Sequence, residues 1–345
     1  MILLGNTTLN SSTSTIMAPS ARFIFEQRAA TVLFNILNAC PESGPFLLPA
    51  NICPIVPMVL HKAKRLFEFI DISPKTLCMD EDAIIERWLK PDKRPAGIIY
   101  VRSYGAIFDT AAIFAKIKFL SPRALIIDDR CLCPPDFSCS LSPNTDALLY
   151  STGYAKYADL GFGGFGVLDV NLPYISSELP FSAIDLQELV TSYKQSLLER
   201  KRFSYKESDW LDTTTPDISW EYYQSLAEQE CRRVSRMKYL MNSIYTARVA
   251  QEAQIPEVFQ SWRFNILVNN SIDVLEAIKG KGLFASSHYE SLAGLFGPGH
   301  APNAEKVHRH IINLFNDRYF DVGKAIRMTD LLGRLKLSHP GSFFK

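Results

Sequence analysis

The sequence predicts an α/β fold in which helices cover a mostly parallel central β-sheet. Between residues 46 and 150, short apolar runs of strand length alternate with segments whose apolar residues recur at helical spacing. Alternation at such short intervals is typical of right-handed βαβ units. After Gly166 the segments become longer and mostly helical, which predicts a smaller C-terminal α+β domain.

The length and apolar content of the chain allow two domains. It has 345 residues, of which 47% are hydrophobic, enough to bury a sizeable core. Residues 1–20 are rich in Ser, Thr and Asn without periodicity, and we expect a flexible arm there. A polar stretch at 209–217 is the expected junction between a large domain over 21–208 and a small domain over 209–345.

The composition argues against several classes of protein. A formal net charge of +1 gives no reason to expect nucleic acid or an anionic membrane as partner. Because no run of about 18 apolar residues is present, no membrane span is expected. The seven cysteines are odd in number and follow no secretory signal, so we expect a cytoplasmic protein with reduced thiols. Their spacing lacks the paired knuckles of zinc sites, so no metal is expected.

The first predicted helix covers 22–39, where Phe25, Val32 and Ile36 recur at helical spacing, and Gly44 lies just beyond its end. Asp80 is the expected N-cap of a later helix. The other predicted helices of this half cover 54–64, 80–89 and 110–118, and the predicted strands cover 46–48, 66–72, 97–101, 124–127 and 147–150.

The second half is predicted to be mainly helical. We expect a strand over 264–268 and a strand or turn over 283–289. The predicted helices cover 184–199, 220–249, 273–279, 304–312 and 322–332.

Residues whose side chains could bind a ligand or take part in a reaction are concentrated between Asp128 and Lys156. Ligands of parallel sheets lie at the carboxyl ends of the strands, and Asp128–Asp129 and Ser151–Gly153 fall at two such ends. Lys156 follows shortly afterwards. An apolar pocket would lower the pKa of its amine and make it nucleophilic, which suits a Schiff base with an aldehyde.

These residue types match the needs of pyridoxal phosphate. A buried Asp129 requires a cationic partner, and a protonated pyridine nitrogen is one. Ser151, Thr152 and the adjacent backbone N–H groups can hold a phosphate. The alternative is an exposed lysine beside an aspartate that caps a strand or forms a salt bridge, and these residues alone leave both explanations open.

The same stretch resembles the DegT-type sugar aminotransferases. That family places an acidic pair at a strand end, then a Ser-x-x-x-x-Lys stretch, then a Gly-x-Gly-Gly turn, which correspond here to Asp128–Asp129, Ser151–Lys156 and Gly161–Gly164. The resemblance implies the type I fold of aspartate aminotransferase, a pyridoxal-phosphate-dependent transferase. It also implies that Lys156 bonds covalently to the cofactor and moves protons, that Asp129 faces the pyridine nitrogen, and that Ser151 holds the phosphate.

The resemblance extends from about residue 21 to about residue 335. Gln27 and Arg28 stand at the family's early phosphate-binding turn, and Tyr104 at its aromatic turn near the cofactor. His288 and Tyr289 resemble its His-Tyr segment, which implies contact with the substrate. The implied protein is a homodimer that transfers an amino group from glutamate to a nucleotide-linked keto-sugar.

The sequence departs from the family pattern at three places. Cys53 replaces an aromatic residue that stacks on the cofactor ring, and Leu132 replaces a Gln or His near its phenolic oxygen. The family's Asn-x-Arg segment, which reaches the phosphate of a neighbouring subunit, has no counterpart between 205 and 220. These departures support the alternative of a non-catalytic or divergent member of the fold. Lys156 argues against the dehydratase branch of the family, which has histidine there.

Overall fold

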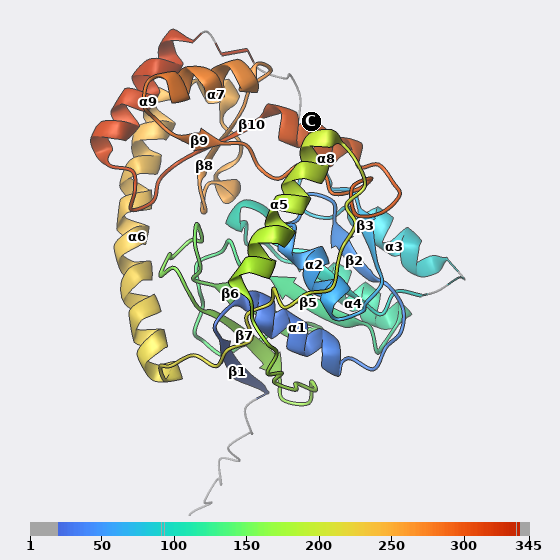
Figure 1. Ribbon diagram of the computed structural model, residues 1–345. Coiled ribbons are helices and arrows are strands. Elements are labelled where there is room, and N and C mark those ends of the chain that lie inside the picture. Colours follow the sequence, from blue (N-terminus) through green and yellow to red (C-terminus); the bar gives the residue numbers. More distant parts are fainter. Residues whose placement is uncertain (1–19, 91, 93, 336, 339–345) are drawn as a thin grey trace, which may run out of the picture.

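The computed structural model describes residues 20–90, 92, 94–335 and 337–338 (Figure 1). The predicted arm at 1–20 lies outside these residues, apart from Ser20. None of the described helices is long and apolar enough to cross a membrane.

A seven-stranded sheet forms the larger part of the molecule, in the order β1-β7-β6-β5-β4-β2-β3. Five neighbouring strands pair in parallel, in the order β6, β5, β4, β2 and β3. The strand β7 is antiparallel to both of its neighbours, β1 and β6. The predicted mostly parallel sheet is therefore confirmed. The strands are β1 (Ala21–Glu26), β2 (Phe46–Pro49), β3 (Phe67–Ile70), β4 (Gly97–Val101), β5 (Leu125–Asp129), β6 (Ala147–Ser151) and β7 (Gly164–Asp169).

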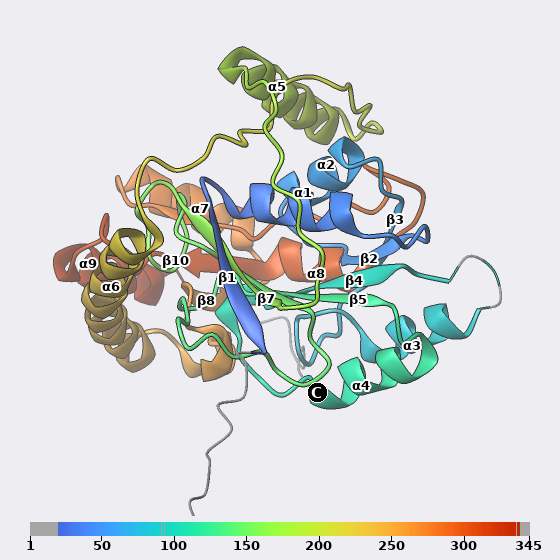
Figure 2. The same cartoon turned by 90° about the horizontal axis from the view of Figure 1, so that it is seen from below.

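Helices cover both faces of this sheet (Figure 2). On one face lie α1 (Ala29–Ala39) and α2 (Ile55–Lys62), with α5 (Ala183–Glu199) outside them. On the other face lie α3 (Glu81–Leu89), which Asp80 caps as predicted, and α4 (Ala111–Leu120). Successive side chains of each strand point to opposite faces, so each face has its own apolar core.

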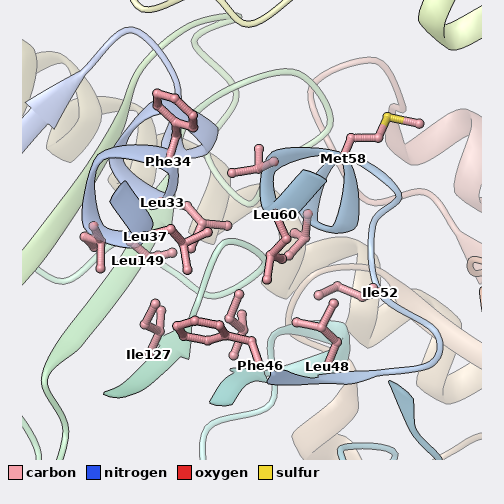
Figure 3. Close-up of a cluster of buried hydrophobic side chains, with 14 of the residues drawn as sticks. Leu33, Phe34, Leu37, Phe46, Leu48, Ile52, Met58, Leu60, Ile127 and Leu149 are labelled. Carbon is pink, nitrogen blue, oxygen red and sulfur yellow. The ribbon is translucent and has the colours of Figure 1, made fainter. Parts of the chain in front are cut away.

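The core beneath α1 and α2 supports the site described below. Leu33 and Leu37 of α1 and Leu60 of α2 pack against Ile127 and Leu149 of the sheet (Figure 3). The neighbouring strand residue Ile126 instead belongs to the core beneath α3 and α4. The alternation along β5 therefore sends Ile127 and Asp129 toward α1 and α2, and Ile126 and Asp128 toward α3 and α4.

A smaller antiparallel sheet, in the order β8-β10-β9, lies in the C-terminal half. The long helix α6 joins this half to the large sheet, because Tyr223 packs in a core of the large sheet while Met241 and Tyr245 pack in the core of the small one. The elements are α6 (Trp220–Arg248), β8 (Phe264–Leu267), α7 (Ser271–Gly280), β9 (Ala285–Ser286), α8 (Pro302–His310), β10 (Ile311–Leu314) and α9 (Val322–Arg334).

Two predicted helix boundaries were wrong. The helix expected over 22–39 begins only at Ala29, because residues 21–26 form β1 and pair with β7. The helix expected over 304–312 ends at His310, because Ile311 and Ile312 belong to β10 and pair with β8. In both cases an apolar strand directly adjoins a helix, and its residues extend the apparent helical period.

Gly164 allows β7 to approach the first residue of α1. A Cβ atom at Gly164 would lie 2.0 Å from the backbone nitrogen of Ala29. We expect Gly164→Ala to lower the free energy of unfolding by about 3 kcal/mol, because α1 must shift to relieve the overlap. The matched control Gly333→Ala meets nothing within 4 Å on α9 and should raise it by about 1 kcal/mol. Urea unfolding measures both, and equal stabilities of Gly164→Ala and wild type would contradict the close approach.

Candidate active site

The two adjacent aspartates at the end of β5 have different environments. Asp128 is fully buried and receives hydrogen bonds from Arg102 Nε (2.7 Å) and Nη2 (2.9 Å). Arg130 Nε also donates to Asp128, at 2.9 Å. Asp128 is therefore neutralised on the α3–α4 side of the sheet.

Asp129 lies on the other side of the sheet, facing α1 and α2, and only 7% of its surface is exposed. Its Oδ1 accepts the Cys131 N–H at 2.9 Å, and none of the described residues forms an ion pair with it. Burial raises the pKa of Asp129, and the hydrogen bond from Cys131 and the charge of Lys156 oppose this rise only in part. A buried carboxyl group in this state favours a cationic partner.

Lys156 lies in the loop between β6 and β7, where its N–H donates to the carbonyl of Gly153 at 3.3 Å. No described residue forms a hydrogen bond or ion pair with its Nζ. Burial lowers the pKa of Lys156, but Cys131, Cys53 and Asp129 together outweigh burial and raise it above its usual value. The predicted lowering of this pKa was therefore wrong, because the prediction considered burial without the neighbouring sulfur and carboxyl groups.

A cavity of about 310 Å³ brings several of the predicted site residues together. Five of the residues that the sequence singled out line it: Arg28, Cys53, Asp129, Ser151 and Lys156. The other walls are mainly apolar and come from α1, α2, α5 and residues 210–212, with Leu33, Val56, Val59, Leu186, Trp210 and Leu211. These apolar walls were not predicted, because no local pattern distinguishes them from core residues.

Arg28 and Ser151 form a polar end of the cavity. A Cβ atom placed on Gly153 would lie 3.4 Å from Ser151 Oγ and 3.7 Å from Arg28 Nη1, so both groups converge beside this glycine. Arg28 Nη1 donates to the carbonyl of Gly161 at 2.9 Å. Arg28 also precedes the first residue of α1, and no side chain caps that helix. A guanidinium, a hydroxyl and uncapped helical N–H groups suit an anion such as phosphate.

Gln27 does not line the cavity. Its carbonyl accepts the Gly163 N–H at 2.9 Å and thereby ties the turn before α1 to the loop that carries Lys156. Tyr104 is also outside the cavity wall, fully buried in a 3-10 turn (Ser103–Gly105) with its hydroxyl unpaired. Its ring lies 4.5 Å from the ring of His288.

His288 and Tyr289 do not line the cavity, and His288 is buried whereas 40% of the Tyr289 surface is exposed. Burial, with smaller contributions from His308 and Lys156, lowers the pKa of His288 to about 3, so its imidazole is neutral at neutral pH. The pKa of Tyr289 is raised well above its usual value, mainly by Cys53 and secondly by burial. A hydrogen bond with the Cys53 side chain contributes to this rise, so the phenol lies next to Cys53. Among the described residues, no cluster of His, Cys, Asp or Glu could hold a metal ion.

The donor set of the cavity fits pyridoxal phosphate. Asp129, which forms no ion pair with the described residues, offers a carboxyl group to the protonated ring nitrogen, and Lys156 offers its amine to the aldehyde. Arg28 and Ser151 offer hydrogen-bond donors for the phosphate. Each charged part of the cofactor thus has a counterpart of suitable chemistry within one cavity.

No family model matches the sequence, and no curated protein matches it. Solved structures do match the fold. A DegT DnrJ EryC1 StrS aminotransferase from Brucella abortus is 16% identical, with a TM-score of 0.63, and the match covers 91% of this chain and 86% of that chain. PseC from Helicobacter pylori, an aminotransferase involved in the biosynthesis of pseudoaminic acid, is 13% identical, with a TM-score of 0.65 and coverage of 91% and 86%.

A third similar structure is the E coli GDP-4-keto-6-deoxy-D-mannose-3-dehydratase with bound hydrated PLP. It is 12% identical, with a TM-score of 0.60, and the match covers 91% of this chain and 88% of that chain. The chain therefore has the type I fold of pyridoxal-phosphate-dependent aminotransferases, which confirms the predicted fold class.

The two aspartates should respond differently to amidation in the protein without cofactor. Asp128→Asn leaves Arg102 and Arg130 without a buried counter-charge, and we expect it to lower the free energy of unfolding by about 3–5 kcal/mol. Because the folded protein raises the pKa of Asp129, that carboxyl favours folding while it is protonated, and the benefit is lost as the pH rises through its folded pKa.

Asp129→Asn should therefore be more stable than wild type at pH 7, by a margin that shrinks toward pH 4. Urea unfolding at both pH values measures this margin. A destabilisation by Asp129→Asn at pH 7 as large as that of Asp128→Asn would contradict the assignment of the two environments.

Proposed function

We propose that this protein is a pyridoxal-phosphate-dependent aminotransferase that transfers an amino group from glutamate to a nucleotide-linked keto-sugar. The observation that supports it is the presence of Lys156 and Asp129 in one cavity, with Arg28 and Ser151 converging at another part of its wall. The cavity volume, about 310 Å³, is at the lower end of the range of small-molecule sites.

The proposal gives each residue a physical task. Bound pyridoxal phosphate would supply an electron sink, and Asp129 would keep its ring nitrogen protonated. Arg28, Ser151 and the start of α1 would hold the phosphate through charge-assisted hydrogen bonds. Lys156 would bind the cofactor covalently, and its Nζ would carry the proton that moves between carbon atoms.

The remaining predicted residues have supporting roles in this proposal. Cys53 would lie beside the cofactor, where the family has an aromatic ring, and Gln27 would position the phosphate-binding turn through its carbonyl group. Tyr104 would support His288, whose neutral imidazole lies near Lys156, and Tyr289 would approach the substrate beside Cys53.

The similar solved structures support the choice of reaction and substrate class. The proteins from Brucella abortus and Helicobacter pylori are aminotransferases, and the latter is involved in the biosynthesis of pseudoaminic acid. The E coli protein was solved with bound hydrated PLP. We also propose that the protein is a cytoplasmic homodimer, because its sequence resembles those of the sugar aminotransferases.

The proposal predicts a covalent complex with pyridoxal phosphate at one lysine. Wild-type protein mixed with the cofactor should show a visible absorption band, and borohydride should fix the cofactor on Lys156, as peptide mass spectrometry would detect. Lys156→Ala should lose both signals, whereas Lys279→Ala, which removes an exposed lysine of α7, should keep them.

Addition of glutamate should bleach the band of the wild-type protein, because the amino group passes to the cofactor. A wild-type spectrum identical to that of Lys156→Ala would contradict the proposed enzyme. A band that no amino donor bleaches would instead favour another reaction of the same cofactor.

A further inference from the structure

The residue directly before Lys156 has an unfavourable backbone conformation. Ala155 has a φ of 59°, in the left-handed region that L-residues other than glycine rarely adopt. It belongs to the turn in which the Lys156 N–H contacts the Gly153 carbonyl. Because the conformation of Ala155 determines the direction in which the following residue leaves the backbone, it also determines where the Lys156 side chain points.

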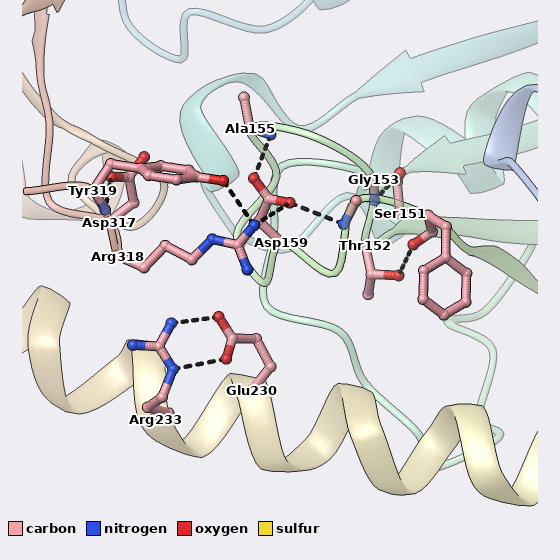
Figure 4. Close-up of polar contacts among 12 residues, drawn as sticks. Ser151, Thr152, Gly153, Ala155, Asp159, Glu230, Arg233, Asp317, Arg318 and Tyr319 are labelled. Atoms are coloured by element: carbon pink, nitrogen blue, oxygen red, sulfur yellow. Dashed lines mark hydrogen bonds and ion pairs between the residues drawn. The ribbon is translucent and has the colours of Figure 1, made fainter.

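Two hydrogen bonds hold both polar backbone groups of Ala155. Its N–H donates to Asp159 Oδ2 at 3.0 Å, within the same loop (Figure 4). Its carbonyl accepts the indole Nε1–H of Trp262 at 2.8 Å. Asp159 also accepts the Gly161 N–H at 2.9 Å and lies 3.6 Å from Arg318. The left-handed turn is thus fixed from inside the loop by Asp159 and from outside by Trp262.

Trp262 is itself anchored in the C-terminal half of the chain. Its backbone N–H donates to the carbonyl of Tyr104 at 3.1 Å, and its carbonyl accepts a hydrogen bond from Lys238 of α6. The same Lys238 Nζ lies 5.0 Å from the ring centre of Tyr157, the residue after Lys156. The Tyr157 hydroxyl is 2.9 Å from Ser235 Oγ, also on α6. The loop of Lys156 is therefore held by residues that belong to α6 and to the segment before β8.

We propose that Trp262 is a positioning residue for Lys156: its indole N–H holds Ala155 in the left-handed conformation that directs the lysine into the cavity. This inference rests on the proposed function for its consequence, but the positioning itself concerns only residues of this chain. Without the indole hydrogen bond, the peptide after Ala155 can rotate toward the favoured region. The Lys156 amine would then move away from Asp129, Cys131 and Cys53.

A simple packing role for the Trp262 ring is the competing explanation. The ring has neighbours of its own, since its centre lies 6.0 Å from that of His288 and 5.2 Å from the Arg263 guanidinium. Trp262→Phe keeps an aromatic ring but removes the indole N–H. Ala155→Gly removes the cost of the left-handed conformation, because glycine adopts a positive φ freely. The double variant separates the two roles, since glycine can restore the turn but cannot restore ring packing.

The experiment compares wild type, Trp262→Phe, Ala155→Gly and the double variant. At limiting pyridoxal phosphate, we expect borohydride fixation on Lys156 to be about tenfold slower in Trp262→Phe, the effect of losing one buried hydrogen bond. Ala155→Gly alone should stay close to wild type. The double variant should recover most of the rate, with thermal unfolding followed in parallel to confirm that each variant is folded.

A second measurement needs no cofactor. In protein labelled with 13C-lysine, the Cε signal that disappears in Lys156→Ala reports the titration of this amine. In Trp262→Phe we expect its pKa to fall toward the ordinary value, because the amine leaves the groups that raise it. The double variant should return it toward the wild-type value.

The outcomes separate this inference from the proposed function. If wild type never forms the visible band, the proposed function fails, while the NMR titration still decides the positioning role. If wild type forms the band and Trp262→Phe matches it in fixation and titration, the positioning role is overturned. It is also overturned if the double variant behaves as Trp262→Phe does, because the defect then comes from lost ring packing.

Discussion

The candidate site depends on a buried carboxyl group that forms no ion pair with any of the described residues. β5 presents two aspartates to opposite faces of the sheet, and two arginines neutralise only Asp128. Asp129 remains in an apolar cavity, where burial raises its pKa. Such a group costs stability in the protein alone and becomes favourable when a cation binds. The cavity therefore favours a ligand that brings a positive charge to Asp129, as the protonated ring of the proposed cofactor would.

Lys156 connects this carboxyl group to the rest of the molecule. The lysine belongs to the loop between β6 and β7, but the bonds that determine its direction come from further along the chain. Trp262 reaches Ala155 from 107 residues away, and Ser235 of α6 contacts Tyr157. The large sheet thus supplies the polar groups of the cavity, while residues of the C-terminal half contact the loop that carries Lys156.

Local sequence patterns predicted the strands of the parallel sheet because buried strands form short, continuous apolar runs. They failed for β1 and β10, whose apolar residues adjoin those of α1 and α8 and extend the helical period. Asp129 and Ser151 were recognisable as site candidates because each lies at the end of a buried strand, and Lys156 because of its spacing after Ser151. The raised pKa of Lys156 was not predictable, because it depends on Cys131, Cys53 and Asp129, which only the fold brings close to its amine. The contact between Trp262 and Ala155 likewise exists only in the folded chain.

The protonation state of the bound cofactor's ring nitrogen tests the role of Asp129 most directly. Pyridoxal phosphate labelled with 15N in the ring would be bound to wild type and to Asp129→Asn, and its 15N chemical shift followed with pH. In wild type, the ring nitrogen should stay protonated well above the pH at which the free cofactor loses this proton. In Asp129→Asn, the nitrogen should be unprotonated at the same pH. An unprotonated nitrogen in wild type, with the same shift as in Asp129→Asn, would contradict this role of Asp129.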